Sequence, residues 1–289
     1  MAVWHVIVLA IVQGLAELLP VSSSAHVIVA EELLGMNPAA PQMTLLLVML
    51  HTGTMFAVIA YFWRRWYRAF FQSVPDFKKF VVALVLATVL TGVVGGGLIE
   101  GIEKIYLRKE PHAWIEQLFG RLDLIAVALA AVGVLILIAG LRERRSRAAE
   151  SAAASEMTLK QTVLIGAVQG LCLPFRGFSR SGATISTGML AGVAKMRAED
   201  FSFALAVVLT PPAIARELWR LIQMQHIHHD ANLVSAIMPD ILGAVCAFVA
   251  GLIALKWLSR WLESGRWYFF GIYCLAAAGA VAYLYHVGY

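Results

Sequence analysis

Long apolar stretches are the feature that most limits the fold of this chain. A transmembrane helix needs about 20 consecutive, predominantly apolar residues. Only 14% of the residues are charged, whereas a soluble domain carries roughly 25%. The sequence therefore predicts an all-α integral membrane protein, whose full membrane spans are Met43–Trp63, Phe80–Ile99, Leu122–Leu141, Phe201–Leu221, Ile237–Trp257 and Trp267–Tyr285.

Charge and cysteine content exclude several other classes of protein. The net charge of +5 comes from short basic loops, so it serves to orient the chain in a membrane and requires no nucleic-acid partner. Cys172, Cys246 and Cys274 all lie in apolar segments. Their odd number and unpaired spacing indicate neither a disulfide framework nor a zinc site. The first segment lacks the basic start and cleavage site of a signal peptide, so we expect it to stay in the mature protein.

Two stretches interrupt the apolar pattern with the same order of features. One runs from Val12 to His26 and the other from Val168 to Thr184. Each contains an apolar helix, Gln-Gly, a proline, a serine-containing turn and a second helix. The second helix is too short to cross a hydrocarbon core of about 30 Å. Each stretch is therefore predicted to form a re-entrant hairpin, with helices at Val3–Leu19 and Ala25–Leu34, and at Leu159–Pro174 and Thr184–Val193.

The two hairpins predict an inverted-topology repeat within a single membrane domain. Each half would contain one hairpin and three transmembrane helices. Because an odd number of spans separates the hairpins, they would enter the membrane from opposite sides. The first repeat covers about residues 1–141, a cytoplasmic linker covers 142–158, and the second repeat covers about 159–289. In such folds the binding site lies at the repeat interface near the bilayer midplane.

Basic clusters predict the orientation of the chain. They follow Trp63 and Leu141, and a third lies between Lys256 and Arg266. All three fall on one side of the predicted layout. The positive-inside rule assigns this side to the cytoplasm, so both termini are expected outside.

The first turn carries residue types that are costly in a membrane. Gln13 and Glu17 are four residues apart and share a helix face. An intramembrane carboxylate is a functional candidate, although Glu17 could also be a structural partner of an arginine such as Arg180. Ser23 and His26 are three residues apart, so a hydroxyl nucleophile could lie beside an imidazole base. The helix start at Ser22, Ser23 and Ser24 favours an anion, although one serine could simply cap the helix.

The second turn carries the positively charged side chain, Arg180. Arg180 lies among hydroxyl groups, and a guanidinium can grip phosphate oxygens in pairs. Arg176, four residues earlier, could add a second charge or be an ordinary loop cation. The residues predicted to surround a bound anion here are Arg176, Gly177, Ser179, Arg180, Ser181 and Thr184.

Two further histidine-containing stretches allow less specific interpretations. His51 interrupts an apolar span, and it could line the cavity or hydrogen-bond to a neighbouring helix. The His226–Asp230 stretch has the composition of a metal cluster. We interpret it as an exposed loop outside the membrane.

The two turns resemble those of undecaprenyl-diphosphate phosphatases, the bacitracin-resistance family of bacterial membrane enzymes. The first signature of this family is matched by Gln13, Glu17, Pro20, Val21, Ser22, Ser23 and His26. The second is matched by Gly177, Ser179, Arg180, Ser181 and Thr184. The sequence departs from the pattern at Arg176, where the family usually has proline. Gln13 is the uncharged option at its position.

The resemblance implies removal of the terminal phosphate of undecaprenyl diphosphate, a prenyl diphosphate lipid. The product, undecaprenyl phosphate, is the lipid carrier for peptidoglycan synthesis. The resemblance also implies a divalent cation, Mg²⁺ or Ca²⁺, a site open to the outer face of the bacterial inner membrane, and a homodimer.

Residues and resemblance together predict a division of roles. Arg180, Ser179, Ser181 and Thr184 would hold the diphosphate, with Ser22, Ser24, Gly177 and Arg176 around it. Glu17 and Gln13 would position the cation. Ser23 would attack the terminal phosphorus while His26 handles the proton, and direct attack by water is the alternative.

A secondary transporter or lipid flippase is the main alternative function. Inverted repeats are typical of transporters, but a transporter needs no nucleophile beside its anion site. A second kind of lipid phosphatase has Ser-Arg, then five intervening residues, then His-x-x-x-Asp. Ser186 occupies that histidine position here, which excludes this assignment.

Overall fold

The chain folds into helices joined by short connections, as the apolar sequence predicts. The computed structural model describes residues 2–37, 41–106, 115–146, 157–227, 233–262 and 266–288, and no strand occurs among them. The helices in chain order are α1 (Val3–Ala16), α2 (Ser23–Leu33), α3 (Pro41–Phe70), α4 (Val74–Tyr106), the 3₁₀ turn η1 (Ile115–Leu118), α5 (Leu122–Ser146), α6 (Leu159–Leu171), α7 (Arg180–Leu190), α8 (Lys195–Ile227), α9 (Leu233–Leu262) and α10 (Tyr268–His286).

Within the described residues, each half of the chain contains two short α-helices followed by three long ones. Helices α3, α4, α5, α9 and α10 are long and apolar enough to cross a membrane. Helix α8 contains the predicted span Phe201–Leu221 but is not one of these five. Pro211 and Pro212 lie inside α8, and several side chains in its second half lie outside the described part of the chain.

The short helices form the two predicted hairpins, but their bounds differ from the prediction. Helix α1 ends at Ala16 and α6 at Leu171, before the predicted ends. The residue that precedes a proline is driven out of the helical region, and the chain leaves the helix ahead of Pro20 and Pro174. Helices α2 and α7 begin at Ser23 and Arg180, earlier than predicted. For α7 the cause is Ser179, whose side chain caps the helix start.

Several long helices extend beyond the predicted apolar stretches. Helix α3 continues through the basic cluster to Phe70, and α4 runs from Val74 to Tyr106. The start of the predicted loop Glu100–Arg121 is therefore helical. An ion pair between Glu100 and Lys104, one helical turn apart, supports this extension. Most of the linker 142–158 lies outside the described residues.

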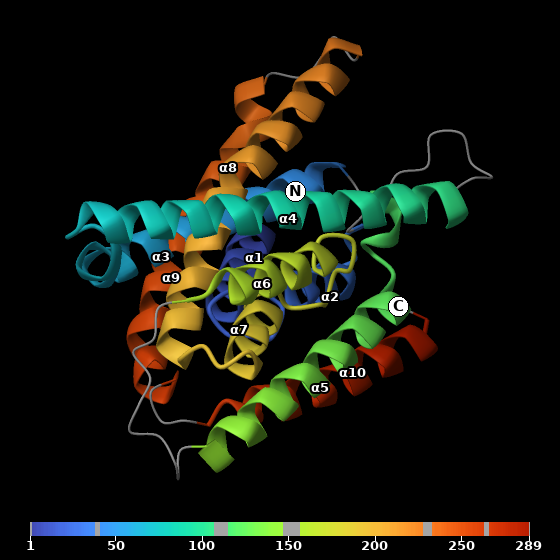
Figure 1. Cartoon of the computed structure of the whole chain (residues 1–289). Helices are drawn as coiled ribbons and strands as arrows, with labels where there is room; N and C mark the ends of the chain where they lie inside the picture. Colours follow the sequence, from blue (N-terminus) through green and yellow to red (C-terminus); the bar gives the residue numbers. More distant parts are fainter. Residues whose placement is uncertain are drawn as a thin grey trace.

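The two halves of the chain interlock around the hairpins. Helix α1 of the first half packs against α9 of the second, and α6 of the second half packs against α4 of the first. Helices α5 and α10 pack side by side and lie apart from α4 (Figure 1). These reciprocal contacts are those expected of a repeat. The opposite insertion of the two halves stays a prediction.

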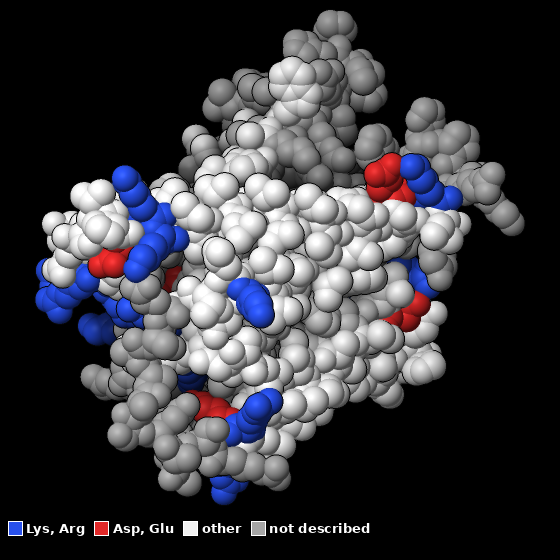
Figure 2. Space-filling view, in the orientation of Figure 1, with Lys and Arg blue, Asp and Glu red and all other residues white. Residues whose placement is uncertain are grey.

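The surface is that of a membrane protein. Helix α4 crosses the front of the molecule in Figure 1, and the same region of Figure 2 is almost free of charged side chains. Its exposed residues there are apolar, among them Val82, Val85, Val89 and Val93. Lysine and arginine gather at one end of this face, where α3 meets α4 (Figure 2). An uncharged face of this kind fits contact with lipid.

Helices α3 and α9 approach each other closely at Gly53. A Cβ atom on this residue would overlap the carbonyl oxygen of Ala244 in α9. We predict that Gly53→Ala lowers the stability of the detergent-purified protein by about 1–3 kcal/mol, the usual cost of overpacking. Thermal unfolding measures the effect. Gly279→Ala is the matched control, because a Cβ atom added to Gly279 in α10 would meet no atom of another part of the chain within 4 Å. Equal melting temperatures for the two variants would contradict the close approach.

Candidate active site

The structure brings the two turns together, as the sequence predicts. Arg180 Nη2, at the start of α7, donates a hydrogen bond to Glu17 Oε1 over 2.8 Å. Ser181 Oγ lies 3.5 Å from the carbonyl oxygen of Leu19. A Cβ atom on Gly182 would lie 3.0 Å from the carbonyl oxygen of Pro20. The backbones of the two turns are therefore in direct contact.

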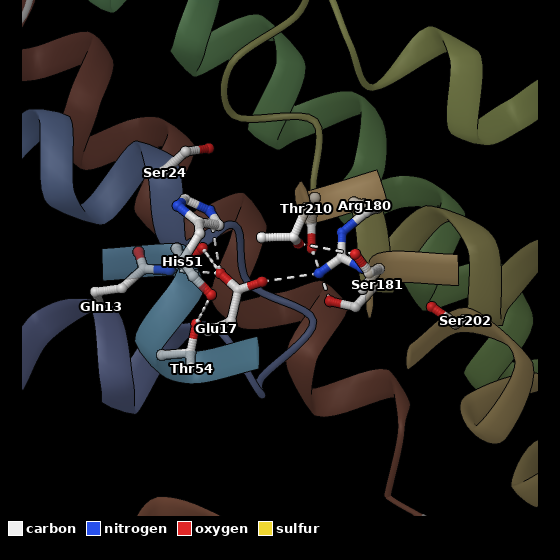
Figure 3. A network of polar contacts seen from close by, with 12 residues as sticks. Gln13, Glu17, Ser24, His51, Thr54, Arg180, Ser181, Ser202 and Thr210 are labelled. Carbon is white, nitrogen blue, oxygen red and sulfur yellow. Dashed lines mark hydrogen bonds and ion pairs between the residues drawn. The ribbon is translucent and has the colours of Figure 1, made fainter. Parts of the chain in front are cut away.

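Glu17 is the residue on which the polar contacts converge (Figure 3). Gln13 Nε2 donates to Glu17 Oε2 over 2.7 Å, from one helical turn earlier. Ser23 Oγ donates to the same carboxylate oxygen. His51 Nε2, on α3, lies 3.3 Å from it. The carboxylate is only 9% exposed, so these neighbours replace most of its hydration.

Arg180 has one nitrogen available for a ligand. Its Nη2 is bound to Glu17, whereas its Nη1 is buried and has no hydrogen-bond partner among the described residues. An unpaired buried donor is costly. An anion that reached Nη1 would remove this cost. The structural interpretation of Glu17 as an arginine partner is therefore confirmed as a contact, and it leaves Arg180 able to bind an anion.

A cavity of about 450 Å³ opens beside this contact. Polar residues of both turns line one part of it and apolar side chains of α3 and α8 line another. The polar residues are Glu17, Ser22, Ser23, Ser24, Arg176, Ser179, Arg180 and Ser181, and the apolar ones include Leu47, Val58, Phe203, Val207 and Leu209. The cavity could therefore bind both the charged end and the apolar part of one ligand.

The starts of α2 and α7 differ in how their backbone amides are satisfied. Ser179 caps α7, because its hydroxyl accepts a hydrogen bond from Gly182 N over 3.2 Å. Ser22 occupies the same position before α2, with a left-handed φ of 66° and no side-chain cap bond. The first amides of α2 remain without a side-chain cap and point out of a helix N-terminus that favours an anion. Of the two helices, α2 has the more open anion site.

His26 does not face Ser23, which corrects the expected arrangement. Its Nδ1 donates to the Ser22 carbonyl oxygen over 2.8 Å, and its Nε2 lies 2.7 Å from Tyr273 Oη on α10. The ring does not line the cavity. Because Ser23 is the first residue of α2, its hydroxyl points back to Glu17 instead.

Three other predicted residues contribute through the backbone or the packing. Thr184 is fully buried and its hydroxyl lies 2.6 Å from Ser202 Oγ of α8. It is not part of the cavity wall, so it positions α7 against α8. Gly177 has a φ of +96°, and a Cβ there would lie 2.7 Å from the Ile125 carbonyl oxygen. Arg176 lines the cavity with its guanidinium 4.3 Å from the ring centroid of Phe119.

His51 is the residue for which the sequence left two interpretations open. The structure places it in the cavity wall and beside Glu17. Its distance from both turns in the sequence gives no indication of this contact. The only available signal was a histidine within an apolar span.

The site contains part of a cation-binding set. No three His, Cys, Asp or Glu side chains gather around one point in the described part of the chain. Glu17 and His51 form a pair of ligand types, and Gln13, which is fully buried, has an Oε1 atom without a described hydrogen-bond partner. Carboxylate and amide oxygens with phosphate oxygens suit Mg²⁺ or Ca²⁺. The side chains of His226–Asp230 lie outside the described residues.

Comparisons with known proteins extend over almost the whole chain. The family described as bacitracin resistance protein BacA matches residues 6–280. A protein of Acinetobacter baylyi named undecaprenyl-diphosphatase 2 is 54% identical over 280 residues, which is 96% of each chain. A Burkholderia ambifaria protein of the same name is 35% identical over 96% of this chain and 95% of its own. Undecaprenyl-diphosphatase 1 of Burkholderia pseudomallei is 34% identical with the same coverage. The similarity thus includes both hairpins.

The turn before α7 depends on the absence of a side chain at Gly177. We predict that Gly177→Ala destabilises the protein by more than the roughly 1–2 kcal/mol that a left-handed conformation costs other residues. The added Cβ would also press on the Ile125 backbone. Gly192→Ala is the control, because Gly192 also has a positive φ, of +86°, but a Cβ atom added there would meet no other atom within 4 Å. Chemical or thermal unfolding compares them. A Gly177→Ala variant that is as stable as the control would contradict the packing of this turn.

Proposed function

Because the chain belongs to the bacitracin resistance protein BacA family, we propose that it hydrolyses undecaprenyl diphosphate to undecaprenyl phosphate and inorganic phosphate. The observation that carries this proposal is the contact of the Ser23 hydroxyl with Glu17, beside the unpaired nitrogen of Arg180. A nucleophile, a proton acceptor and an anion-binding arginine thus share one cavity. A transporter or flippase would need the arginine but not the nucleophile or the proton acceptor.

The substrate would be held by its charged end and its tail. Arg180 Nη1, the amides at the start of α2 and Arg176 supply positive charge or donors for the diphosphate. Ser22, Ser24, Ser179 and Ser181 add hydroxyl groups along the same wall. The prenyl chain would lie on the apolar residues of α3 and α8. Phosphoryl transfer depends mostly on such positioning and charge neutralisation.

The reaction proceeds by two displacements at the terminal phosphorus. Ser23 Oγ attacks the phosphorus while its proton passes to Glu17, and the bond to the bridging oxygen breaks to release undecaprenyl phosphate. Water then attacks the phosphorus of the phosphoserine, and the bond from phosphorus to Ser23 Oγ breaks. Ser23 Oγ takes back the proton held by Glu17, and the hydrogens of the water leave with inorganic phosphate. Glu17 replaces His26 as the proton acceptor, because Ser23 donates to Glu17. Direct attack by water, with Ser23 orienting it, is the alternative.

A divalent cation, Mg²⁺ or Ca²⁺, completes this proposal. Glu17 would hold it, with the Oε1 atom of Gln13 as a further oxygen donor. When bound, it neutralises charge on the diphosphate. Arg180 would then contact the phosphate oxygens with Nη1 and keep the terminal phosphate aligned with Ser23.

The cellular setting is inferred from the same family. The chain would lie in the bacterial inner membrane with both termini outside and the cavity open to the outer face. It would form a homodimer in the bilayer and recycle the lipid carrier for peptidoglycan.

Removal of the Ser23 hydroxyl tests the nucleophile. We predict that Ser23→Ala reduces phosphate release from a prenyl diphosphate in detergent by at least about 100-fold, because the displacement loses its attacking oxygen. Ser24→Ala should lose less, since Ser24 lines the cavity without contacting Glu17. Full activity of Ser23→Ala would remove the serine from the first displacement and favour water.

The geometry of the guanidinium is tested at Arg180. Lysine keeps the charge but lacks the paired donors, so we predict that Arg180→Lys lowers kcat/KM by about 10-fold or more. Arg180→Ala should lower it further. Melting temperatures of both variants check that the buried Glu17 is still accommodated. Wild-type kcat/KM in a folded Arg180→Lys protein would show that only charge matters.

A further inference from the structure

Among the described residues, His51 is the histidine that lines the cavity, and the proposed reaction assigns it no role. It lies in the middle of α3, on the opposite side of Glu17 from Arg180 (Figure 3). Its Nε2 is 3.3 Å from Glu17 Oε2, whereas Arg180 contacts Oε1. Glu17 therefore has a guanidinium at one oxygen and an imidazole at the other.

The hydrogen bond of the other ring nitrogen determines the tautomer of His51. Nδ1 lies 2.7 Å from the carbonyl oxygen of Leu47. A carbonyl can only accept, so Nδ1 carries a hydrogen. In the neutral imidazole Nε2 then presents a lone pair. In that neutral form the lone pair faces an oxygen of a carboxylate, an arrangement that either a proton or a cation between the two atoms relieves.

This arrangement is that of a metal-binding histidine. Such residues commonly donate the distal N–H to a backbone carbonyl, which fixes the ring and leaves the other nitrogen for the metal. Thr54 Oγ1 also donates to the His51 carbonyl oxygen over 3.0 Å and ties down the same turn of α3. The imidazole is thus held in place before any cation binds.

Gln13 adds a third donor atom next to the same carboxylate oxygen. Its amide nitrogen lies 2.7 Å from Glu17 Oε2, and its oxygen is buried without a described partner. Amide oxygen and nitrogen are nearly equivalent in shape, and their assignment follows the hydrogen-bond network. With a cation at this point, the opposite assignment would turn the amide oxygen toward the cation.

We propose that His51 Nε2 is a ligand of the divalent cation, together with the carboxylate of Glu17. The proposal deepens the proposed function and rests on it for the role of the cation at the diphosphate. Mg²⁺ and Ca²⁺ prefer oxygen ligands, whereas imidazole suits transition metals, and Mn²⁺ accepts both carboxylate and nitrogen. A site with one imidazole and one carboxylate favours Mn²⁺ over Ca²⁺.

Mn²⁺ alone, added to the purified protein in detergent, tests the ligand assignment. Electron paramagnetic resonance measures free Mn²⁺, and pulsed measurements detect the nuclear coupling of a directly bound imidazole nitrogen. We expect this coupling in the wild type and its loss in His51→Asn. Even residues that only hydrogen-bond to a metal ligand commonly contribute about 10-fold to 100-fold to metal affinity, so loss of a direct ligand should lower the Mn²⁺ affinity by about 10-fold or more. The affinity for Ca²⁺, measured by competition, should change less, because asparagine offers an oxygen.

Two controls separate His51 from the other histidines. His26→Asn should keep the coupling, because His26 lies in the same site region but outside the cavity wall. A variant with His226, His228 and His229 all replaced by Asn should also keep it. Absence of nitrogen coupling in the wild type, or its persistence in His51→Asn, would overturn the assignment.

This readout is independent of catalysis. The wild type could show nitrogen coupling that His51→Asn lacks and yet release no phosphate. That result would support His51 as a metal ligand and contradict the phosphatase function. Phosphate release by a wild type without nitrogen coupling would contradict only the role of His51.

Discussion

The ion pair between Glu17 and Arg180 is the interaction on which the arrangement of this protein depends. Each residue belongs to a different half of the chain, and each would be costly alone inside a membrane. Loss of one partner of a buried pair commonly costs about 3–5 kcal/mol, because the other charge remains. The pair therefore requires both hairpins to end at the same place. Non-helical backbone is tolerated at membrane depth only where protein or a wet cavity surrounds it, and each turn gives the other that cover.

The same contact explains how a stable structure can hold a reactive site. Glu17 is satisfied by Gln13, Ser23 and Arg180. Ser23, the proposed nucleophile, would therefore be aligned with its proposed proton acceptor before substrate arrives. Arg180 keeps a second nitrogen unpaired. A diphosphate at this nitrogen would gain a strong donor without requiring the Glu17 contact to break. Binding and folding thus use different atoms of one guanidinium.

Much of this site could be predicted from the sequence, because its central residues lie in two recognisable turns. The spacing of Gln13, Glu17 and Ser23, and the Ser-Arg-Ser of the second turn, indicated a shared anion site. The place of His51 in the cavity wall was one of two interpretations of the sequence and is confirmed. Its contact with Glu17 could not be predicted, since it depends on how α3 packs against α1. The Ser23–His26 contact was wrong because helix spacing does not show that the ring bonds to the Ser22 carbonyl and to Tyr273. Helix ends were displaced by local proline and serine effects.

An experimental structure with a non-hydrolysable prenyl diphosphonate is the most direct measurement of the central claim that both turns act on one phosphate. The account predicts that the terminal phosphorus lies about 3–3.5 Å from Ser23 Oγ, the distance of a near-attack arrangement, with an oxygen of the same group bound to Arg180. A diphosphonate that contacted only one turn, or that lay away from Ser23 while Arg180 stayed on Glu17 alone, would contradict the shared site.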